Sequence, residues 1–219
     1  MIKAIIFDVD GVIIESAEIK TKAFGMLFAN YPDKLPEIIA YHQKNAGISR
    51  YIKFRYFYEK LLGQELSAQK EAELGESFSQ IVLGEIFNAP FTPGAIEFLS
   101  RNKDRYHFFI ASGTPEEELQ KIIAHRQLSH FFKEIRGTPK QKEEIIEDIL
   151  DRYPLHKKEV VFIGDAESDR TSAEKAGILF IARINSENPQ LQDCRWKVND
   201  LTELDTVLDN ISSYQKKGG

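Results

Sequence analysis

The stretch Ala4-Ile5-Ile6-Phe7-Asp8-Val9-Asp10-Gly11-Val12 decides how this chain is organised. Residues 2–7 form a nearly unbroken apolar run with β-branched side chains, which is typical of a strand buried on both faces of a parallel sheet. Asp8 and Asp10 follow it, and we expect their carboxylates to converge on one site where the chain curls at Gly11. In isolation the same residues also fit an ordinary turn that closes a strand.

Composition excludes several classes of protein. The 219 residues carry a net charge of −5 with a pI near 5.6, so we expect no general attraction to nucleic acid or to an anionic membrane. A single cysteine, Cys194, excludes an internal disulfide and a cysteine-based zinc site. No signal segment and no long apolar run stand in the sequence, so we expect a cytoplasmic protein that does not bind membranes.

Residues 16–87 show apolar positions at helical spacing, interrupted by turn signals near residues 31–33, 45–47 and 62–63. This pattern predicts about four helices. The third, near residues 49–62, interleaves aromatic residues with Arg50, Lys53, Arg55 and Lys60. Such a pattern could bind nucleic acid, but the acidic chain favours an aromatic core on one face and solvated charge on the other.

From residue 91 onward short apolar strands alternate with helices, which predicts an α/β fold with a doubly wound parallel sheet. The first strand belongs to that sheet, so the helices of residues 16–87 are an insertion after it. We expect the last residues, Gln215 to Gly219, to fray. The expected helices are 93–101, 116–124, 141–151 and 167–176, and the expected strands are 106–111, 159–163 and 178–182, with a short element near Ile135.

Ligands of such sheets bind beyond the carboxyl ends of the strands. One strand ends in Ser112-Gly113-Thr114-Pro115, where Thr114 and Glu117 are spaced as a capping box with Pro115 at the first helical position. A hydroxyl and free N–H groups there suit a phosphoryl oxygen, although a plain helix start gives the same sequence.

A later strand ends in Gly164-Asp165-Ala166-Glu167-Ser168-Asp169. Asp165 and Asp169 lie one helical turn apart on the same side, so they bring two further carboxylates to the same edge of the sheet. Carboxylates so close repel one another unless a cation lies between them. The same residues also fit the solvated acidic first turn of a helix, which needs no cation. Lys140 and Lys142 begin the helix before that strand. Four carboxylates, a hydroxyl and a lysine at successive strand ends indicate a site for Mg²⁺ and phosphate.

These motifs together resemble the haloacid dehalogenase superfamily of phosphatases, in the group with a helical C1-type cap that contains phosphoglycolate phosphatases and β-phosphoglucomutases. Asp8-Val9-Asp10-Gly11-Val12 matches the first family motif, Ser112-Gly113-Thr114 the second, Lys142 the third, and Gly164-Asp165 with Asp169 the fourth. The resemblance implies a Rossmann-like core made of residues 1–14 and 91–219, and a cap domain of residues 15–90.

The resemblance also implies a magnesium-dependent phosphatase acting on a small-molecule phosphate ester. Asp8 is then the nucleophile and Asp10 the acid and base, with Mg²⁺ held by Asp8, Asp165, Asp169 and the Asp10 carbonyl. Ser112, Gly113 and Lys142, rather than Lys140, are expected to hold the phosphoryl group. In the cap, Lys20, Lys44, Arg50 and Lys53 are candidates to meet a second anionic group of the substrate, Lys20 and Arg50 foremost.

Two other functions remain open. Gly47-Ile48-Ser49-Arg50 resembles a cap loop of sugar-phosphate mutases, but Lys20 stands where those mutases have a histidine, and Pro-x-Pro is missing after Lys142. A hydrolase is therefore favoured over a mutase. A non-catalytic binding module is less favoured still, because both Asp8 and Asp10 are present.

Overall fold

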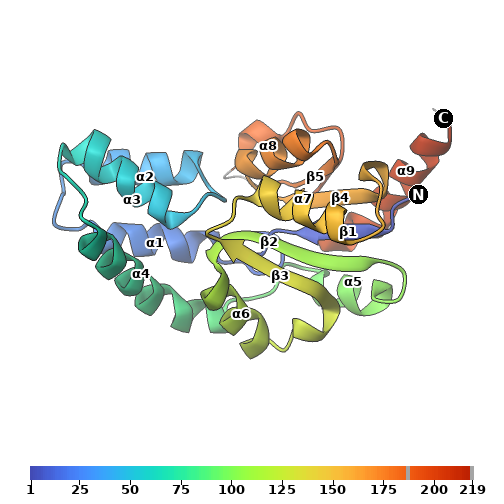
Figure 1. The fold of residues 1–219 in the computed structure, drawn as a ribbon, viewed down its shortest axis with the longest axis horizontal. Coiled ribbons are helices and arrows are strands. Elements are labelled where there is room, and N and C mark those ends of the chain that lie inside the picture. Colours follow the sequence, from blue (N-terminus) through green and yellow to red (C-terminus); the bar gives the residue numbers. More distant parts are fainter. Residues whose placement is uncertain (186–187, 218–219) are drawn as a thin grey trace.

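The computed structural model describes residues 1–185 and 188–217 (Figure 1). Within them, six strands form one sheet in the order β3-β2-β1-β4-β5-β6, and every neighbouring pair is parallel. The order runs outward in both directions from β1, which places the switch of direction between β1 and β4. The strands are β1 (Ala4–Phe7), β2 (His107–Pro115), β3 (Phe132–Thr138), β4 (Val160–Gly164), β5 (Leu179–Arg183) and β6 (Lys197–Val198).

Successive side chains of β1 point to opposite faces of the sheet, and both faces are buried, as the apolar run predicts. Ala4 and Ile6 pack in the cluster that includes residues of α7 and α8, whereas Ile5 and Phe7 pack in the larger cluster on the other face. The predicted doubly wound parallel sheet is thereby confirmed. The helices of this part are α5 (Ala95–Asn102), α6 (Glu116–His125), α7 (Lys142–Arg152), α8 (Glu167–Ala176) and α9 (Leu204–Lys217).

The carboxyl-terminal segment is more ordered than the sequence predicts. Residues 215–217 belong to α9, and the Gln215 side-chain amide donates to the Lys158 carbonyl at 2.7 Å. The expected fraying is therefore wrong as far as Lys217, and residues 218–219 lie outside the described part.

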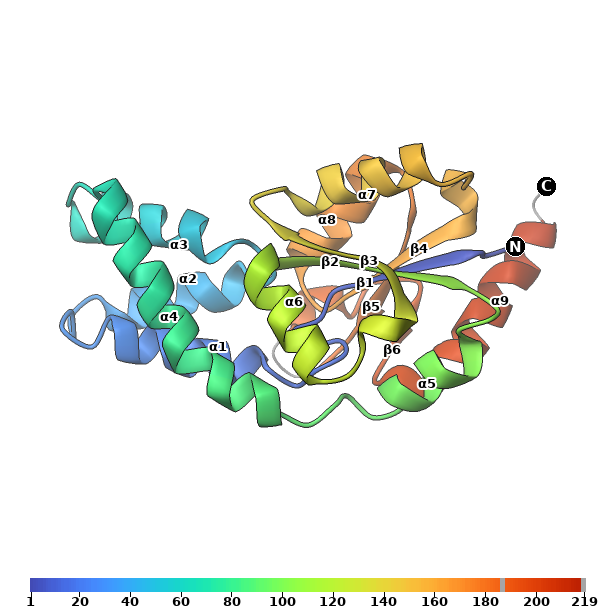
Figure 2. The same cartoon turned by 60° about the horizontal axis from the view of Figure 1, so that its bottom comes forward.

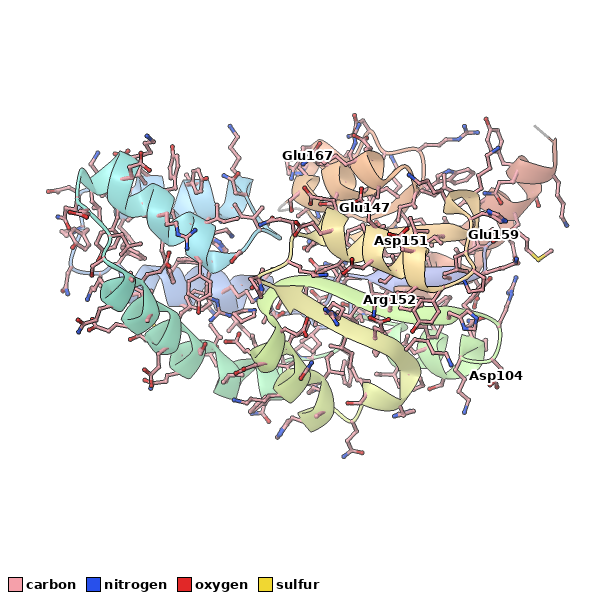
Figure 3. The ribbon with its side chains drawn as sticks, in the orientation of Figure 1. Asp104, Glu147, Asp151, Arg152, Glu159 and Glu167 are labelled. Carbon is pink, nitrogen blue, oxygen red and sulfur yellow. The ribbon has the colours of Figure 1, made fainter. Side chains whose placement is uncertain are left out.

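The outer faces of α7 and α8 carry exposed acidic side chains, among them Glu147, Asp151 and Glu167 (Figure 3).

The inserted helices lie together beyond the carboxyl end of β1, at one end of the molecule in both views (Figures 1 and 2). The long helix predicted near residues 49–62 is present, but its second half is a π-helix, η1 (Phe57–Leu62). The remaining inserted helices are α1 (Ala17–Leu27), α2 (Leu35–Lys44), α3 (Arg50–Tyr56) and α4 (Ala68–Asn88).

An aromatic core holds the inserted helices together. Phe24 of α1 contacts both Phe54 of α3 and Phe78 of α4, with ring centroids 6.0 and 4.7 Å apart. Aromatic pairs at such distances add to the free energy of burial. The predicted aromatic face of α3 is thus confirmed, but the prediction of solvated charge on that helix is wrong for Arg50 and Lys53, which are only 4% and 3% exposed.

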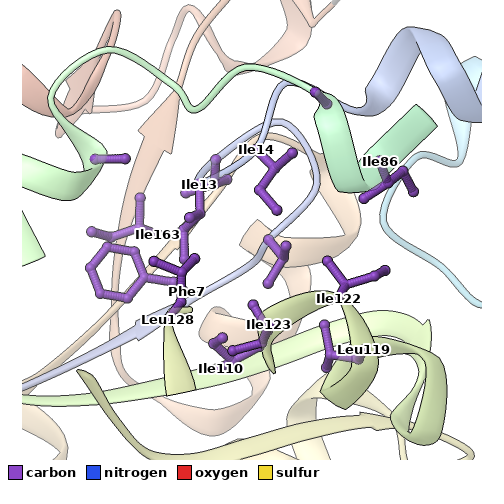
Figure 4. Packing of buried hydrophobic residues seen from close by; sticks show 14 of the residues in the cluster. Phe7, Ile13, Ile14, Ile86, Ile110, Leu119, Ile122, Ile123, Leu128 and Ile163 are labelled. Carbon is purple, nitrogen blue, oxygen red and sulfur yellow. The ribbon is translucent and has the colours of Figure 1, made fainter. Parts of the chain in front are cut away.

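The core of the sheet continues into the inserted helices. Ile86 of α4, Ile14 after β1 and Ile122 of α6 belong to one buried cluster (Figure 4). The division into residues 1–14 with 91–219 and residues 15–90 stays a prediction. In the described part of the chain, no helix is both long and apolar enough to cross a membrane.

Candidate active site

The loop after β1 curls so that both of its carboxylates face one cleft. Backbone N–H groups of Ile13 and Ile14 donate to the Val9 carbonyl at 2.9 and 3.0 Å, and Gly11 has a φ of 73°. Glycine is required there, because a Cβ would collide with the Asp165 carboxylate as well as strain the backbone. Asp8 and Asp10 therefore line the same cleft of about 850 Å³, a volume that includes the open space at its mouth.

Asp8 is held by two donors at the base of the site. Its Oδ1 accepts from the Val9 backbone N–H at 2.7 Å, and its Oδ2 accepts from Lys142 Nζ at 2.8 Å. The same ammonium donates to Asp169 Oδ1 at 2.5 Å. Asp8, Lys142 and Asp169 are all buried, so this is a fully desolvated charge cluster.

Burial is the largest effect on the pKa of Asp8 and raises it, whereas the charge of Lys142 lowers it. Repulsion from Asp169 and Asp10 raises it further, so that the pKa is about 6. For Lys142, burial lowers the pKa, but Asp169 and Asp8 outweigh it, and its pKa lies above the ordinary value. The lysine therefore stays charged while the nucleophile candidate resists ionisation.

Asp165 completes a group of three carboxylates. Oxygens of Asp8, Asp165 and Asp169 lie within 4.8 Å of one another, and all three residues are buried. Burial, followed by repulsion from Asp169 and Asp8, raises the pKa of Asp165 well above its ordinary value. A hard divalent cation with a preference for oxygen ligands, such as Mg²⁺, fits this donor set and would remove the repulsion.

Asp10 belongs to a different set of contacts. Its carboxylate accepts from Ser16 Oγ at 2.6 Å, from Thr114 Oγ1 at 3.0 Å and from Lys20 Nζ. Burial raises the pKa of Asp10, but Lys20 and the three hydrogen bonds outweigh burial, so its pKa is lowered. The side chain of Asp10 thus lies outside the group of three carboxylates, and its carbonyl as a metal ligand stays a prediction.

The capping box predicted at Thr114 is wrong. β2 continues through Pro115, α6 begins at Glu116, and the Thr114 hydroxyl is used by Asp10 and Lys20 instead. Thr114, which the sequence predicted to cap a helix, is therefore a residue of the site.

Ser112 and Gly113 lie between the core and the inserted helices. Ser112 is buried, and its Oγ accepts from the Thr114 backbone N–H at 3.2 Å. It lines a second hollow together with Lys142, and Gly113 lines both this hollow and the first cleft. A Cβ on Gly113 would collide with the Gly47 carbonyl, so the close approach of the inserted loop requires glycine there.

The two lysines at the start of α7 differ as the register predicts. Lys142 points into the site, whereas Lys140 is 44% exposed and pairs with Asp148 on the surface of α7. Residues two apart at a helix start face different sides, so only one of them can reach Asp8.

The candidate substrate contacts on the inserted helices have unequal surroundings. Lys44 is exposed and does not line the cleft, whereas Lys20 and Arg50 do. The Arg50 guanidinium is occupied, since it makes a bidentate ion pair with Glu118 of α6 and donates to Ser79 Oγ at 2.9 Å. The sequence could not reveal this pairing, because 68 residues separate Arg50 from Glu118.

Comparison with known proteins identifies the family that the sequence motifs resemble. The family model "haloacid dehalogenase-like hydrolase" matches residues 2–177. A phosphoglycolate phosphatase from Aliivibrio fischeri is 24% identical over 187 residues, which are 80% of this chain and 81% of that protein.

Solved structures share the fold. A β-phosphoglucomutase from Clostridium difficile has a TM-score of 0.78 at 19% identity, over 98% of this chain and 99% of that one. A predicted phosphoglycolate phosphatase from Haemophilus somnus has a TM-score of 0.73 at 17% identity, over 94% and 98% of the two chains. At these identities the likeness concerns the fold alone.

Binding of Mg²⁺ to the three carboxylates is expected to stabilise the folded chain. At an Mg²⁺ concentration about 100-fold above the Kd, the melting temperature should rise by about 5–10 °C. Asp165→Asn should remove most of this rise. The same variant should melt higher than the wild type without Mg²⁺ at neutral pH, because a carboxylate with a raised pKa destabilises the fold when it is ionised. Thermal unfolding with and without Mg²⁺ measures both, and an equal Mg²⁺ response of the two proteins would exclude Asp165 as a ligand.

Proposed function

Since the chain belongs to the haloacid dehalogenase-like hydrolase family, we propose that it is a magnesium-dependent phosphatase that hydrolyses a small phosphate monoester. Membership confirms the predicted family and enzyme class. The observation that carries the proposal is the position of Asp8, which faces the cleft between Lys142 and the carboxylates of Asp165 and Asp169.

In the first step, a carboxylate oxygen of Asp8 attacks phosphorus, and the bond between phosphorus and the ester oxygen breaks. The leaving oxygen takes a proton from Asp10 and departs as an alcohol. The Val9 N–H and Lys142 orient Asp8 for this attack. Lys142, Ser112 and the backbone at Gly113 are proposed to hold the phosphoryl oxygens.

In the second step, water attacks the aspartyl phosphate and gives its proton to Asp10, which releases inorganic phosphate and restores Asp8. The three donors around Asp10 favour its ionised form, which supports this base role directly. A dianionic ester beside Asp10 raises its pKa, since a like charge disfavours ionisation, and this supports its role as the acid in the first step.

Asp8, Asp165 and Asp169 are the residues proposed to hold Mg²⁺, with the Asp10 carbonyl. Neutralisation of negative charge is the chemistry that the bound ion supplies, so that an anionic nucleophile can approach an anionic ester. The inserted helices lie over the cleft and exclude bulk water from it.

A sugar-phosphate mutase is the second candidate, favoured by the similarity of the fold to a β-phosphoglucomutase. A mutase must keep water from the aspartyl phosphate until its intermediate rebinds. Here Lys20, and not the histidine of the mutases that the sequence resembles, contacts Asp10 and Thr114. This contact favours the hydrolase.

The cytoplasmic location expected from the sequence stays a prediction.

Replacement of the nucleophile tests the proposed function. Asp8→Asn should fold as the wild type does and lose turnover by about 10⁴-fold, because only binding effects remain. The assay is phosphate release from a panel of sugar phosphates, nucleotides and small acid phosphates with Mg²⁺. Turnover of the variant near that of the wild type, or full activity of the wild type in excess chelator, would refute the assignment.

Lys142 and Lys140 offer a matched pair. Lys142→Met should lower kcat by about 10²- to 10³-fold, as the loss of one donor to a developing anion does. Lys140→Met removes a surface ion pair and should stay near the wild type. Steady-state kinetics on the best panel substrate measures both, and the opposite ranking would contradict the role given to Lys142.

The products distinguish the hydrolase from the mutase. With Mg²⁺, β-glucose 1-phosphate and a trace of glucose 1,6-bisphosphate, we expect little glucose 6-phosphate. Both glucose 6-phosphate and free phosphate are followed over time. Rapid isomerisation with little phosphate release would establish the mutase instead.

A further inference from the structure

Glu118 is a buried carboxylate of the core that reaches the inserted helices. It lies in the first turn of α6, next to α4 (Figure 2), and it is 6% exposed. Its Oε2 accepts from Arg50 Nη1 at 3.0 Å, and its Oε1 accepts from Arg50 Nη2. Such a bidentate pair occupies the side of a guanidinium that binds carboxylates and phosphates best. The proposed reaction steps do not use this carboxylate.

Ser79 and Phe78 of α4 hold the pair in place. Ser79 Oγ accepts from Arg50 Nη1 at 2.9 Å and donates to Glu118 Oε2. The guanidinium carbon of Arg50 lies 4.4 Å from the centre of the Phe78 ring. Both terminal nitrogens of Arg50 therefore have buried partners, and the guanidinium cannot turn toward a ligand without breaking these contacts.

Arg50 nevertheless lines the cleft that contains Asp8. An arginine without a counter-charge at such a position attracts anionic groups of a ligand, phosphate above all, because two of its N–H groups match two phosphoryl oxygens. Glu118 opposes this in two ways. It takes the N–H groups of Arg50 for itself, and its negative charge repels a second anion.

The other described cations that line the cleft do not take the place of Arg50. Lys20 is paired with Asp10. Burial, followed by the charge of Lys20, lowers the pKa of Lys53 well below its ordinary value. His42 is neutral, because burial is the largest of the effects that lower its pKa to about 2. The pairing of the guanidinium therefore decides whether this wall of the cleft can bind a second anion.

We propose that Glu118 is a specificity-determining residue, which occupies Arg50 and so restricts the enzyme to esters that carry a single phosphate. This inference rests on the proposed phosphatase function and adds a rule for the charge of its substrates. A pair that only linked α3 to α6 would lower the stability of the fold when broken. It would not, when broken, create affinity for a second phosphate, and this difference can be measured.

Binding of phosphonates of equal chain length, measured by calorimetry with Mg²⁺, tests Glu118 without turnover. One pair is propylphosphonate with propane-1,3-diylbisphosphonate, and the other is hexylphosphonate with hexane-1,6-diylbisphosphonate. The wild type should bind the two members of each pair with similar affinity. Glu118→Gln keeps the shape of the side chain and removes its charge. This variant should bind at least one bisphosphonate about 10- to 100-fold more tightly than its partner, the range for a hydrogen bond to a charged group.

Glu117→Gln is the matched control, because Glu117 is the adjacent residue of α6, is exposed and does not line the cleft. It should keep the wild-type affinities. Addition of Arg50→Met to Glu118→Gln should abolish the gain. If Glu118→Gln does not fold, as judged by circular dichroism, Glu118→Ala takes its place with the same expectation. A wild type that already prefers a bisphosphonate, a Glu118 variant without the gain, or a gain that survives the loss of Arg50 would overturn the inference.

Turnover separates the two proposals. With the best substrate of the phosphatase panel and the same molecule carrying a second phosphate, the wild type should favour the former in kcat/KM, and Glu118→Gln should lose that preference. If no panel ester is hydrolysed but the phosphonate affinities change as expected, the phosphatase proposal fails and the role of Glu118 in excluding a second phosphate stands. Hydrolysis of both esters at equal kcat/KM, with no effect of Glu118→Gln on phosphonate binding, would support the phosphatase and refute the role of Glu118.

Discussion

The ion cluster of Lys142 with Asp8 and Asp169 is the constraint on which the rest of the site depends. Its members come from the end of β1, the start of α7 and the first turn of α8, so it ties three parts of the core to one point. Buried charges persist only when they are paired and hydrogen-bonded. Burial, and then repulsion among carboxylates that outnumber the ammonium group once Asp165 is added, raises the pKa values of Asp8 and Asp165. The cluster is therefore short of positive charge, which favours binding of a divalent cation.

The inserted helices approach this cluster through backbone contacts that small residues allow. The Ala46 carbonyl accepts from Ser168 Oγ at 2.7 Å, and the Gly47 carbonyl lies against Gly113. The buried pair of Arg50 with Glu118 links α3 to α6 on another side. A bidentate guanidinium–carboxylate pair fixes orientation as well as distance. These contacts hold the inserted helices against the core, so that residues of both parts line the cleft.

Charges are divided between the two walls of the cleft. The core supplies the carboxylates of Asp8 and Asp165, whereas Lys20, Arg50 and Lys53 come from the inserted helices. A polar small molecule that enters between them experiences a field with a direction, which favours one orientation over the reverse. The walls are also partly apolar, so this field is weakly screened.

The sequence by itself determined the sheet and the main groups of the core site. The apolar run before Asp8 is read from its period, and the carboxyl ends of parallel strands must meet at one edge, so Asp8, Asp165 and Asp169 converge without further information. The same topology brings a lysine from the start of the next helix to this edge, and the family resemblance favoured Lys142 over Lys140. Strand β6 was not predicted, because its two residues are too few to form a pattern. Helix α9 was not predicted either, although its buried Leu204, Leu208 and Ile211 follow the helical spacing i, i+4 and i+7.

Only the tertiary structure decided the surroundings of the charges on the inserted helices. Arg50 and Lys53 read as solvated residues of an amphipathic helix, yet one pairs with Glu118 and the other with His42. Thr114 read as a helix cap, yet its hydroxyl contacts Asp10. Local patterns report which face of an element is apolar, but they carry no information about which distant element packs against the other face. The partner of a buried charge is fixed by that packing, and so it appears only when the helices are assembled over the sheet.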